Sequence, residues 1–244
     1  MKKLLIAILF VGVLSAHGQD TDPIATDRPT QSAASTVVPK GSALIEYGFI
    51  YESAGDLTNT TMANLLARIG LFEGFEFRIT QNIQQIRNDV TDIKVRGLSP
   101  ITLGTKIHLV GEQGAVPQTS IIAQVTLDNG KQAFRPGEPI PEVRLNFSNS
   151  LSEFLTLGYN LGVAFPEDNT TTIYSAVLGY SFLPGWTAFA EPYGFLYDGG
   201  SDHRFNAGLI YLVSNNFQVD ISGGIGLSDI SPDSFIGFGA AIGF

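Results

Sequence analysis

Cysteine is absent from this chain of 244 residues. Without cysteine, no disulfide framework can stabilise the fold in an oxidising compartment. Metal sites built on thiolate ligands are excluded for the same reason, and so is a lipid anchor attached to an N-terminal cysteine. The fold must therefore be stable without covalent cross-links.

Basic residues are scarce as well. The chain has 14 Lys and Arg against 23 Asp and Glu, which gives a formal net charge of −9. A nucleic-acid-binding domain needs clustered Lys and Arg to neutralise phosphates. We therefore expect no nucleic-acid partner.

Long apolar runs are missing too, apart from one near the N-terminus. Two lysines precede an apolar run over 4–14. This run is too short for a retained membrane anchor, since a transmembrane helix needs about 20 residues. The small residues that follow over 15–18 fit a signal-peptidase site. We predict a signal peptide over 1–18 with cleavage before Gln19, and the loss of two lysines then changes the net charge from −9 to −11.

Helical periodicity is also absent beyond the signal peptide. No segment repeats apolar residues at the i, i+3, i+4, i+7 spacing for long enough to predict a helix, and the period-2 alternation of strands recurs instead. In 234–244 one face comprises Ile236, Phe238, Ala240, Ile242 and Phe244. The opposite face comprises Gly237, Gly239, Ala241 and Gly243, with Phe235 as the exception. A soluble sandwich would carry polar side chains opposite its core, whereas small residues leave room inside a barrel.

Six stretches alternate in this way, and six less regular candidates (42–51, 61–71, 75–86, 119–128, 172–182 and 186–197) complete a set of twelve. The six regular stretches are 101–109, 142–147, 155–165, 204–211, 217–227 and 234–244. Most of the twelve have the length of about 10 residues that a tilted strand needs to cross the apolar layer. The sequence therefore predicts an all-β fold, an up-and-down antiparallel transmembrane β-barrel of about 12 strands. A soluble β-sandwich is the alternative, and it conflicts with the uninterrupted apolar faces of the last strands.

The links between these stretches alternate in length. The short turns are 72–74, 183–185 and 213–216. The longer polar links are 52–60, 87–97 and 129–139. Short periplasmic turns and longer external loops are typical of outer-membrane barrels. We therefore expect the protein among the lipids of the outer membrane of a Gram-negative bacterium, with both ends of the barrel domain facing the periplasm.

The stretch 24–32 reads Ile-Ala-Thr-Asp-Arg-Pro-Thr-Gln-Ser, and a Thr-Val-Val-Pro-Lys-Gly stretch over 36–41 leads into the first strand. This start resembles the mature chains of a family of bacterial outer-membrane transporters labelled as the MetA pathway of phenol degradation. The resemblance implies a monomeric barrel with a transport role, and it supplies no catalytic residues. A last strand that ends in Phe244 also resembles the signal read by the barrel-assembly machinery, so we expect Phe244 to be an assembly signal.

Ten charged residues fall on strand faces opposite the apolar ones, and we expect them to line the lumen. They are Glu46, Arg68, Glu76, Arg78, Lys106, Glu142, Arg144, Glu191, Arg204 and Asp220. Two interpretations stay open. These charges could line a narrow aqueous path, as in channels, or they could pair across the lumen and close it, because a small barrel fills with side chains.

The segment 19–41 precedes the barrel domain, which we place at 42–244, and we expect this segment in the periplasm. It contains Asp20, Asp22, Asp27 and Arg28 together with three prolines. It could act as a gate at or inside the lumen. It could equally be a flexible leader, since chain termini are commonly poorly ordered.

The function we expect is passive passage of small solutes, hydrophobic ones included, through an outer-membrane channel. We expect no enzymatic activity, no catalytic residues, no metal and no cofactor. One alternative is a closed barrel that acts as a structural or surface-interaction protein through its acidic loops. A second is an outer-membrane lipase or protease, which needs a nucleophile with a positioned base. Only His108 and His203 remain after cleavage, and neither is followed by the serine pattern of barrel phospholipases.

Overall fold

The computed structural model describes residues 22–244, so the predicted signal peptide over 1–18 lies outside the described residues. The strands are β1 (Ala43–Ala54), β2 (Leu57–Phe72), β3 (Phe75–Asn88), β4 (Lys94–Leu98), β5 (Thr102–Val110), β6 (Gln118–Thr126), β7 (Ile140–Ser150), β8 (Leu155–Ala164), β9 (Thr171–Leu183), β10 (Trp186–Tyr197), β11 (Gly200–Ser214), β12 (Phe217–Gly226) and β13 (Ser234–Gly243). A short 3₁₀ helix, Gln132–Phe134, lies between β6 and β7. No helix among the described residues is long and apolar enough to cross a membrane.

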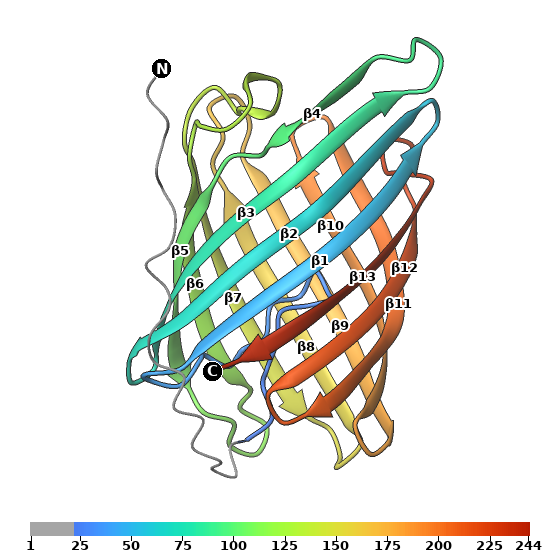
Figure 1. Cartoon of the computed structure of the whole chain (residues 1–244). Helices are drawn as coiled ribbons and strands as arrows, with labels where there is room; N and C mark the ends of the chain where they lie inside the picture. The colour runs from blue at the N-terminus through green and yellow to red at the C-terminus, as the bar shows by residue number, and fades with distance from the viewer. Residues whose placement is uncertain (1–21) are drawn as a thin grey trace, which may run out of the picture.

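These strands form one antiparallel sheet that closes on itself (Figure 1). Closure follows from β2, which pairs with both β1 and β3, and from β1, which pairs with β13. Both β4 and β5 pair with β3, β4 along 83–87 and β5 along 75–80. They therefore share one position in the wall. The predicted antiparallel barrel of twelve strand positions is confirmed.

The break between β4 and β5 contains Pro100, which has no N–H to offer a ladder of hydrogen bonds. Residues 129–131, which follow β6, provide backbone and side-chain hydrogen bonds to the strand at this break. The Asn129 side chain accepts a hydrogen bond from the Ile101 N–H at 2.8 Å, and the Lys131 N–H donates to the Leu98 carbonyl at 2.9 Å. The wall is thus continuous across the break.

The wall has apolar side chains outside and polar ones inside. On β13, Ile236 and Phe238 are 52% and 53% exposed, whereas Ala241 on the other face is 1% exposed. Charged side chains show the opposite distribution, since Glu46 and Arg68 are fully buried. The apolar outer surface of such a barrel suits contact with the hydrocarbon layer of a membrane.

Several strands extend further than their alternation predicts. The predicted loop over 52–60 is wrong, because β1 and β2 continue to a two-residue turn at Gly55 and Asp56. Part of the predicted link over 87–97 is likewise strand, as β4. Polar residues such as Thr58 and Asn59 resemble a loop in sequence, but beyond the apolar layer a strand needs no apolar outer face. Backbone pairing continues there without the alternation.

The two ends of the barrel differ. We call the end at which β1 begins and β13 ends the base, and the opposite end the rim. At the base, Ala43 and Phe244 exchange two backbone hydrogen bonds of 3.1 and 2.8 Å. The label C in Figure 1 marks this end. The longest connections of the described chain, such as 127–139 between β6 and β7, lie at the rim.

Candidate functional site

Residues 22–41, called the inserted segment below, run inside the barrel. The segment is anchored at the base, where the Ile24 N–H donates to the Asn215 carbonyl and the Gly41 N–H to the Gly70 carbonyl, both at 2.8 Å. In Figure 1 its blue trace is visible within the lower half of the barrel. Hydrogen bonds join it to β1, β3, β5, β7, β8, β10 and β12. The inserted segment therefore contacts the barrel wall around most of its circumference. The sequence predicts a periplasmic position for 19–41, and this stays a prediction only for residues 19–21, which lie outside the described residues.

The inserted segment has no regular secondary structure, so its backbone N–H groups need other acceptors. Inward carboxylates supply them. Glu46 accepts from the two N–H groups of 27–28 at 3.0 to 3.1 Å. Glu191 accepts from the two N–H groups of 31–32 at 2.9 and 2.6 Å. These carboxylates bind the backbone of the inserted segment, so this set of contacts adds to the ones that its side chains make.

Asp27 is surrounded by three cations from three neighbouring strands. Its carboxylate lies 3.4 Å from the Arg68 guanidinium, 2.6 Å from that of Arg78 and 3.1 Å from the Lys106 ammonium. Burial by itself raises the pKa of the Asp27 carboxyl, but the charges of Arg68, Lys106 and Arg78 outweigh it and hold the pKa well below its ordinary value. Asp27 is therefore ionised at neutral pH.

Two carboxylates of the wall complete this cluster. Arg68 lies 2.9 Å from Glu76 and 3.2 Å from Glu46, and Glu76 also pairs with Arg78 at 2.8 Å. The wall contributes three cations and two carboxylates, and Asp27 of the inserted segment contributes the third carboxylate. The cluster is electrically balanced only with the segment in place.

Arg28 occupies a slot made by glycines. Its guanidinium pairs with Asp220 on β12, with Nη2 2.9 Å from Oδ1. It also lies over Gly48 of β1 and Gly239 of β13, which face each other in the ladder. A Cβ on Gly48 would be 1.7 Å from the nearest Arg28 nitrogen, and one on Gly239 would be 2.3 Å away. The bare inner face of β13 therefore makes room for the inserted segment.

The remaining charges expected in the lumen form pairs nearer the rim. Arg144 lies 2.8 Å from Glu142 and also donates to the Gln31 carbonyl at 3.3 Å. Arg204 pairs with two carboxylates absent from the predicted set, Asp202 at 2.6 Å and Glu52 at 3.1 Å.

Five of the ten predicted residues thus meet around Asp27, and three others, Arg144, Glu191 and Asp220, also bind the inserted segment. Their role in lining a conducting path stays a prediction. Asp27 and Arg28 themselves were not predicted as site residues. The signal that could have identified them is the Thr-Asp-Arg-Pro element over 26–29, which places an acid and a base beside a proline in an otherwise uncharged stretch.

The two histidines of the barrel lie apart from this cluster. His203 Nδ1 is 2.7 Å from the Tyr174 hydroxyl, so its nearest side-chain partner is a phenol. Within residues 22–244, no three His, Asp or Glu side chains are placed to hold a metal ion.

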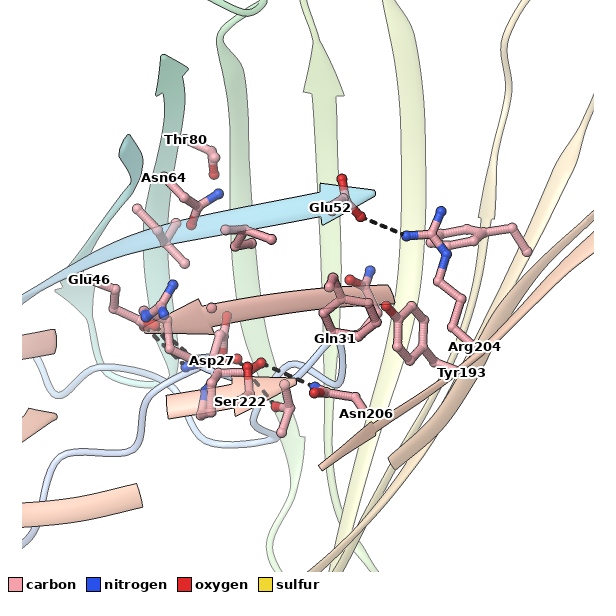
Figure 2. A pocket seen from close by; sticks show the side chains of 18 residues that line it. Asp27, Gln31, Glu46, Glu52, Asn64, Thr80, Tyr193, Arg204, Asn206 and Ser222 are labelled. Atoms are coloured by element: carbon pink, nitrogen blue, oxygen red, sulfur yellow. Dashed lines mark hydrogen bonds and ion pairs between the residues drawn. The ribbon is translucent and has the colours of Figure 1, made fainter. Parts of the chain in front are cut away.

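A cavity of about 360 Å³ lies on the rim side of the inserted segment (Figure 2). The residues 27–31 form its floor, and the ion pair between Glu52 and Arg204 crosses above it. Tyr193 and Asn206 face it from β10 and β11. Within the described residues, the inserted segment therefore occupies the base side of the lumen, and this cavity lies on its rim side.

A closed antiparallel barrel with apolar side chains outside and charges inside defines an outer-membrane β-barrel of the porin-like class. Residues 26–244 match the model of the protein family described as "Putative MetA-pathway of phenol degradation". Because this match covers nine tenths of the chain, the protein belongs to that family. No curated protein matches the sequence.

Solved structures share the fold at low sequence identity. An outer-membrane channel from Pseudomonas putida F1 superposes with a TM-score of 0.70 at 10% identity, over 88% of this chain and all of that one. The KdgM porin, solved with disordered oligogalacturonate, has a TM-score of 0.58 at 14% identity, over 82% of this chain and 99% of that one. The NanC porin has a TM-score of 0.58 at 8% identity, over 81% of this chain and 98% of that one.

Proposed function

We propose that this protein is a passive channel for small solutes in the outer membrane of a Gram-negative bacterium, closed at rest by the inserted segment. The observation that carries the proposal is the ion pairing of Asp27 with Arg68, Arg78 and Lys106 inside the barrel. A charged segment that ion pairs and hydrogen bonds hold inside the lumen, and that is joined covalently to the wall only where it leads into β1, is suited to leave as a unit. With the inserted segment in place, the channel passes little or no ion current.

Two further properties belong to the proposal. Relatives of the same fold are channels and porins, and the family description refers to phenol degradation, which supports small hydrophobic molecules among the solutes. The barrel acts as a monomer without enzymatic activity, and the barrel-assembly machinery reads the last strand with its terminal Phe244.

Planar-bilayer recording tests the channel and its closure together. The purified protein is compared with a variant that lacks residues 22–35, a deletion that leaves the junction to β1 intact. We expect rare or very small current steps for the full chain and a steady, larger conductance for the deletion variant. Heat-modifiable migration on gels shows that both barrels are folded.

The same experiment separates the channel from a closed structural barrel. The pairing of the inward charges favours this second candidate, because Arg204 is neutralised by Asp202 and Glu52 even near the rim. A folded, inserted deletion variant that stays silent would refute the channel and favour a barrel that acts through its acidic loops.

A further inference from the structure

Three exposed cations face outward on one side of the rim. Side chains alternate between the two faces of a strand, and Arg78 of β3 points into the lumen, so Arg87 of β3 points outward. The ladder between β3 and β4 pairs Arg87 with Lys94, and Arg96 follows two residues later on the same face. The hairpin of β3 and β4 stands at the top of the barrel in Figure 1. We call these three residues the outer basic patch.

This position differs from that of the other charges of the barrel. The remaining cations on the described strands are the inward ones that pair with carboxylates in the lumen. At the base, the exposed charged residues in the turns between strands are acidic, namely Glu73, Glu112 and Glu153. The described wall therefore presents outward cations at the rim and on one side only.

Two cations of the outer basic patch have no carboxylate partner within residues 22–244. Arg87 pairs with Asp89 at 3.2 Å and with Asp92 at 3.1 Å, both in the exposed tip of the hairpin. Lys94 and Arg96 form no ion pair with the described residues and are exposed. Their charges are therefore available to an external anion, and guanidinium and ammonium groups bind phosphate oxygens through charge-assisted hydrogen bonds.

Apolar side chains lie directly on the base side of the patch. Leu98 follows Arg96 by two residues on the same face of β4, pairs with Ile83 of β3 and is 51% exposed. Two residues span about 7 Å along a strand. A lipid whose acyl chains contact Leu98 would therefore place its headgroup beside Arg96.

We propose that the outer basic patch binds the phosphate groups of an anionic glycolipid of the outer leaflet. With both ends of the barrel domain in the periplasm, the rim lies in that leaflet, whose lipopolysaccharide carries phosphates on a sugar backbone with acyl chains. Clustered Lys and Arg at the edge of the apolar layer are the arrangement that attracts anionic lipid. The site is on the outer surface, so a barrel that conducts no current would bind the lipid equally well.

Native mass spectrometry of the full chain, released from neutral detergent micelles, tests the proposal with three added lipids. They are bisphosphorylated lipid A, monophosphoryl lipid A with the same acyl chains, and digalactosyl diacylglycerol, a glycolipid without phosphate. We expect the affinity to fall in this order. Lys94→Gln together with Arg96→Gln should weaken binding of bisphosphorylated lipid A by about 30-fold, because each cation beside an anionic lipid contributes about fivefold. Binding of the galactolipid should not change.

Two double variants serve as controls, and heat-modifiable migration on gels shows that each is folded. Lys94→Arg with Arg96→Lys keeps both charges and should bind as the unaltered protein does. Lys40→Gln with Arg135→Gln removes the same charge from exposed positions outside the patch and should also leave binding unchanged. Equal binding of all three lipids, undiminished binding in the first Gln variant, or an equal loss in either control would overturn the site. Glucose 1,6-bisphosphate should not displace the lipid, and displacement would show that a soluble anion occupies the patch instead.

Discussion

At the scale of single residues, Asp27 brings a negative charge to a cluster that otherwise holds three cations and two carboxylates. Arg68 and Lys106 are fully buried. If the Asp27 carboxylate were removed, water could not readily take its place beside these two cations. Removing one partner of a buried ion pair is costly because the remaining charge stays desolvated. The position of the inserted segment should therefore depend strongly on this one side chain.

Asp27→Asn keeps the size and an acceptor oxygen but removes the charge. We expect it to weaken docking of the segment by about 3 kcal/mol, which raises the undocked population by about 100-fold. Single-channel recording should show this as a higher open probability. Asp22→Asn serves as the control, because Asp22 is exposed, and its open probability should equal that of the unaltered protein. Equal open probabilities for all three proteins would contradict the role of Asp27.

Gly48→Ala tests the slot that holds Arg28. The three atoms nearest to the new Cβ all belong to the Arg28 guanidinium, the end of a flexible side chain, so the barrel should fold while Arg28 leaves Asp220. We expect faster proteolysis within the inserted segment, to about the extent seen in Arg28→Ala. The double variant should be no worse than either single one, since both remove the same contact. Gly111→Ala is the control, because no atom lies within 4 Å of its Cβ position.

Additive effects of Gly48→Ala and Arg28→Ala would show that the glycine and the arginine act independently. The slot would then have no part in holding the segment.

At the scale of elements, each strand carries two different requirements on its two faces. The outer face of β13 must match lipid, and its inner face must leave room for Arg28 and Ile24. A charge near the middle of the outer face should cost far more than one at the strand end, because the apolar layer is deepest there.

Phe238→Arg places such a charge near the middle of β13. We expect it to lower the free energy of unfolding by about 2–4 kcal/mol, whereas Ser234→Arg at the rim end of the strand should lower it by only about 0–1 kcal/mol. Urea titration of the protein refolded into lipid vesicles measures both values. A similar loss for the two variants would mean that β13 does not face lipid as its exposed side chains indicate.

At the scale of the whole molecule, the sign of the lumen charge should set ion preference once the inserted segment is removed. The deletion of 22–35 takes away Asp27 and leaves the central cluster with one uncompensated positive charge. In this background, Arg78→Gln together with Arg144→Gln should shift the reversal potential in a salt gradient toward cation preference. Arg87→Gln, at an exposed rim position, should leave it unchanged. An unchanged potential in the double variant would show that these residues do not line the conducting path.

Much of the barrel follows from local alternation, and the exceptions share one physical reason. Alternation indicates on which face of a strand each residue lies. The sequence therefore predicts the twelve strand positions and the inward-facing charges, such as Arg68 and Glu76. Strand ends beyond the apolar layer, as at Thr58 and Asn59, carry no such signal because both faces meet polar surroundings. The path of the inserted segment has no periodicity at all, and it depends on contacts such as that of Asp27 with Lys106, 79 residues away.

The amino-acid sequence by itself thus determined that this protein is an all-β membrane barrel with charges inside, because period-2 patterning and lipid matching are properties of each strand alone. Only the tertiary structure decided that residues 22–41 run inside the barrel, that Asp27 completes a balanced cluster, and that a cavity remains on the rim side of the segment. These features arise when barrel closure brings side chains from distant strands to a common axis. No local pattern encodes that convergence, because it depends on the number and register of all the strands together.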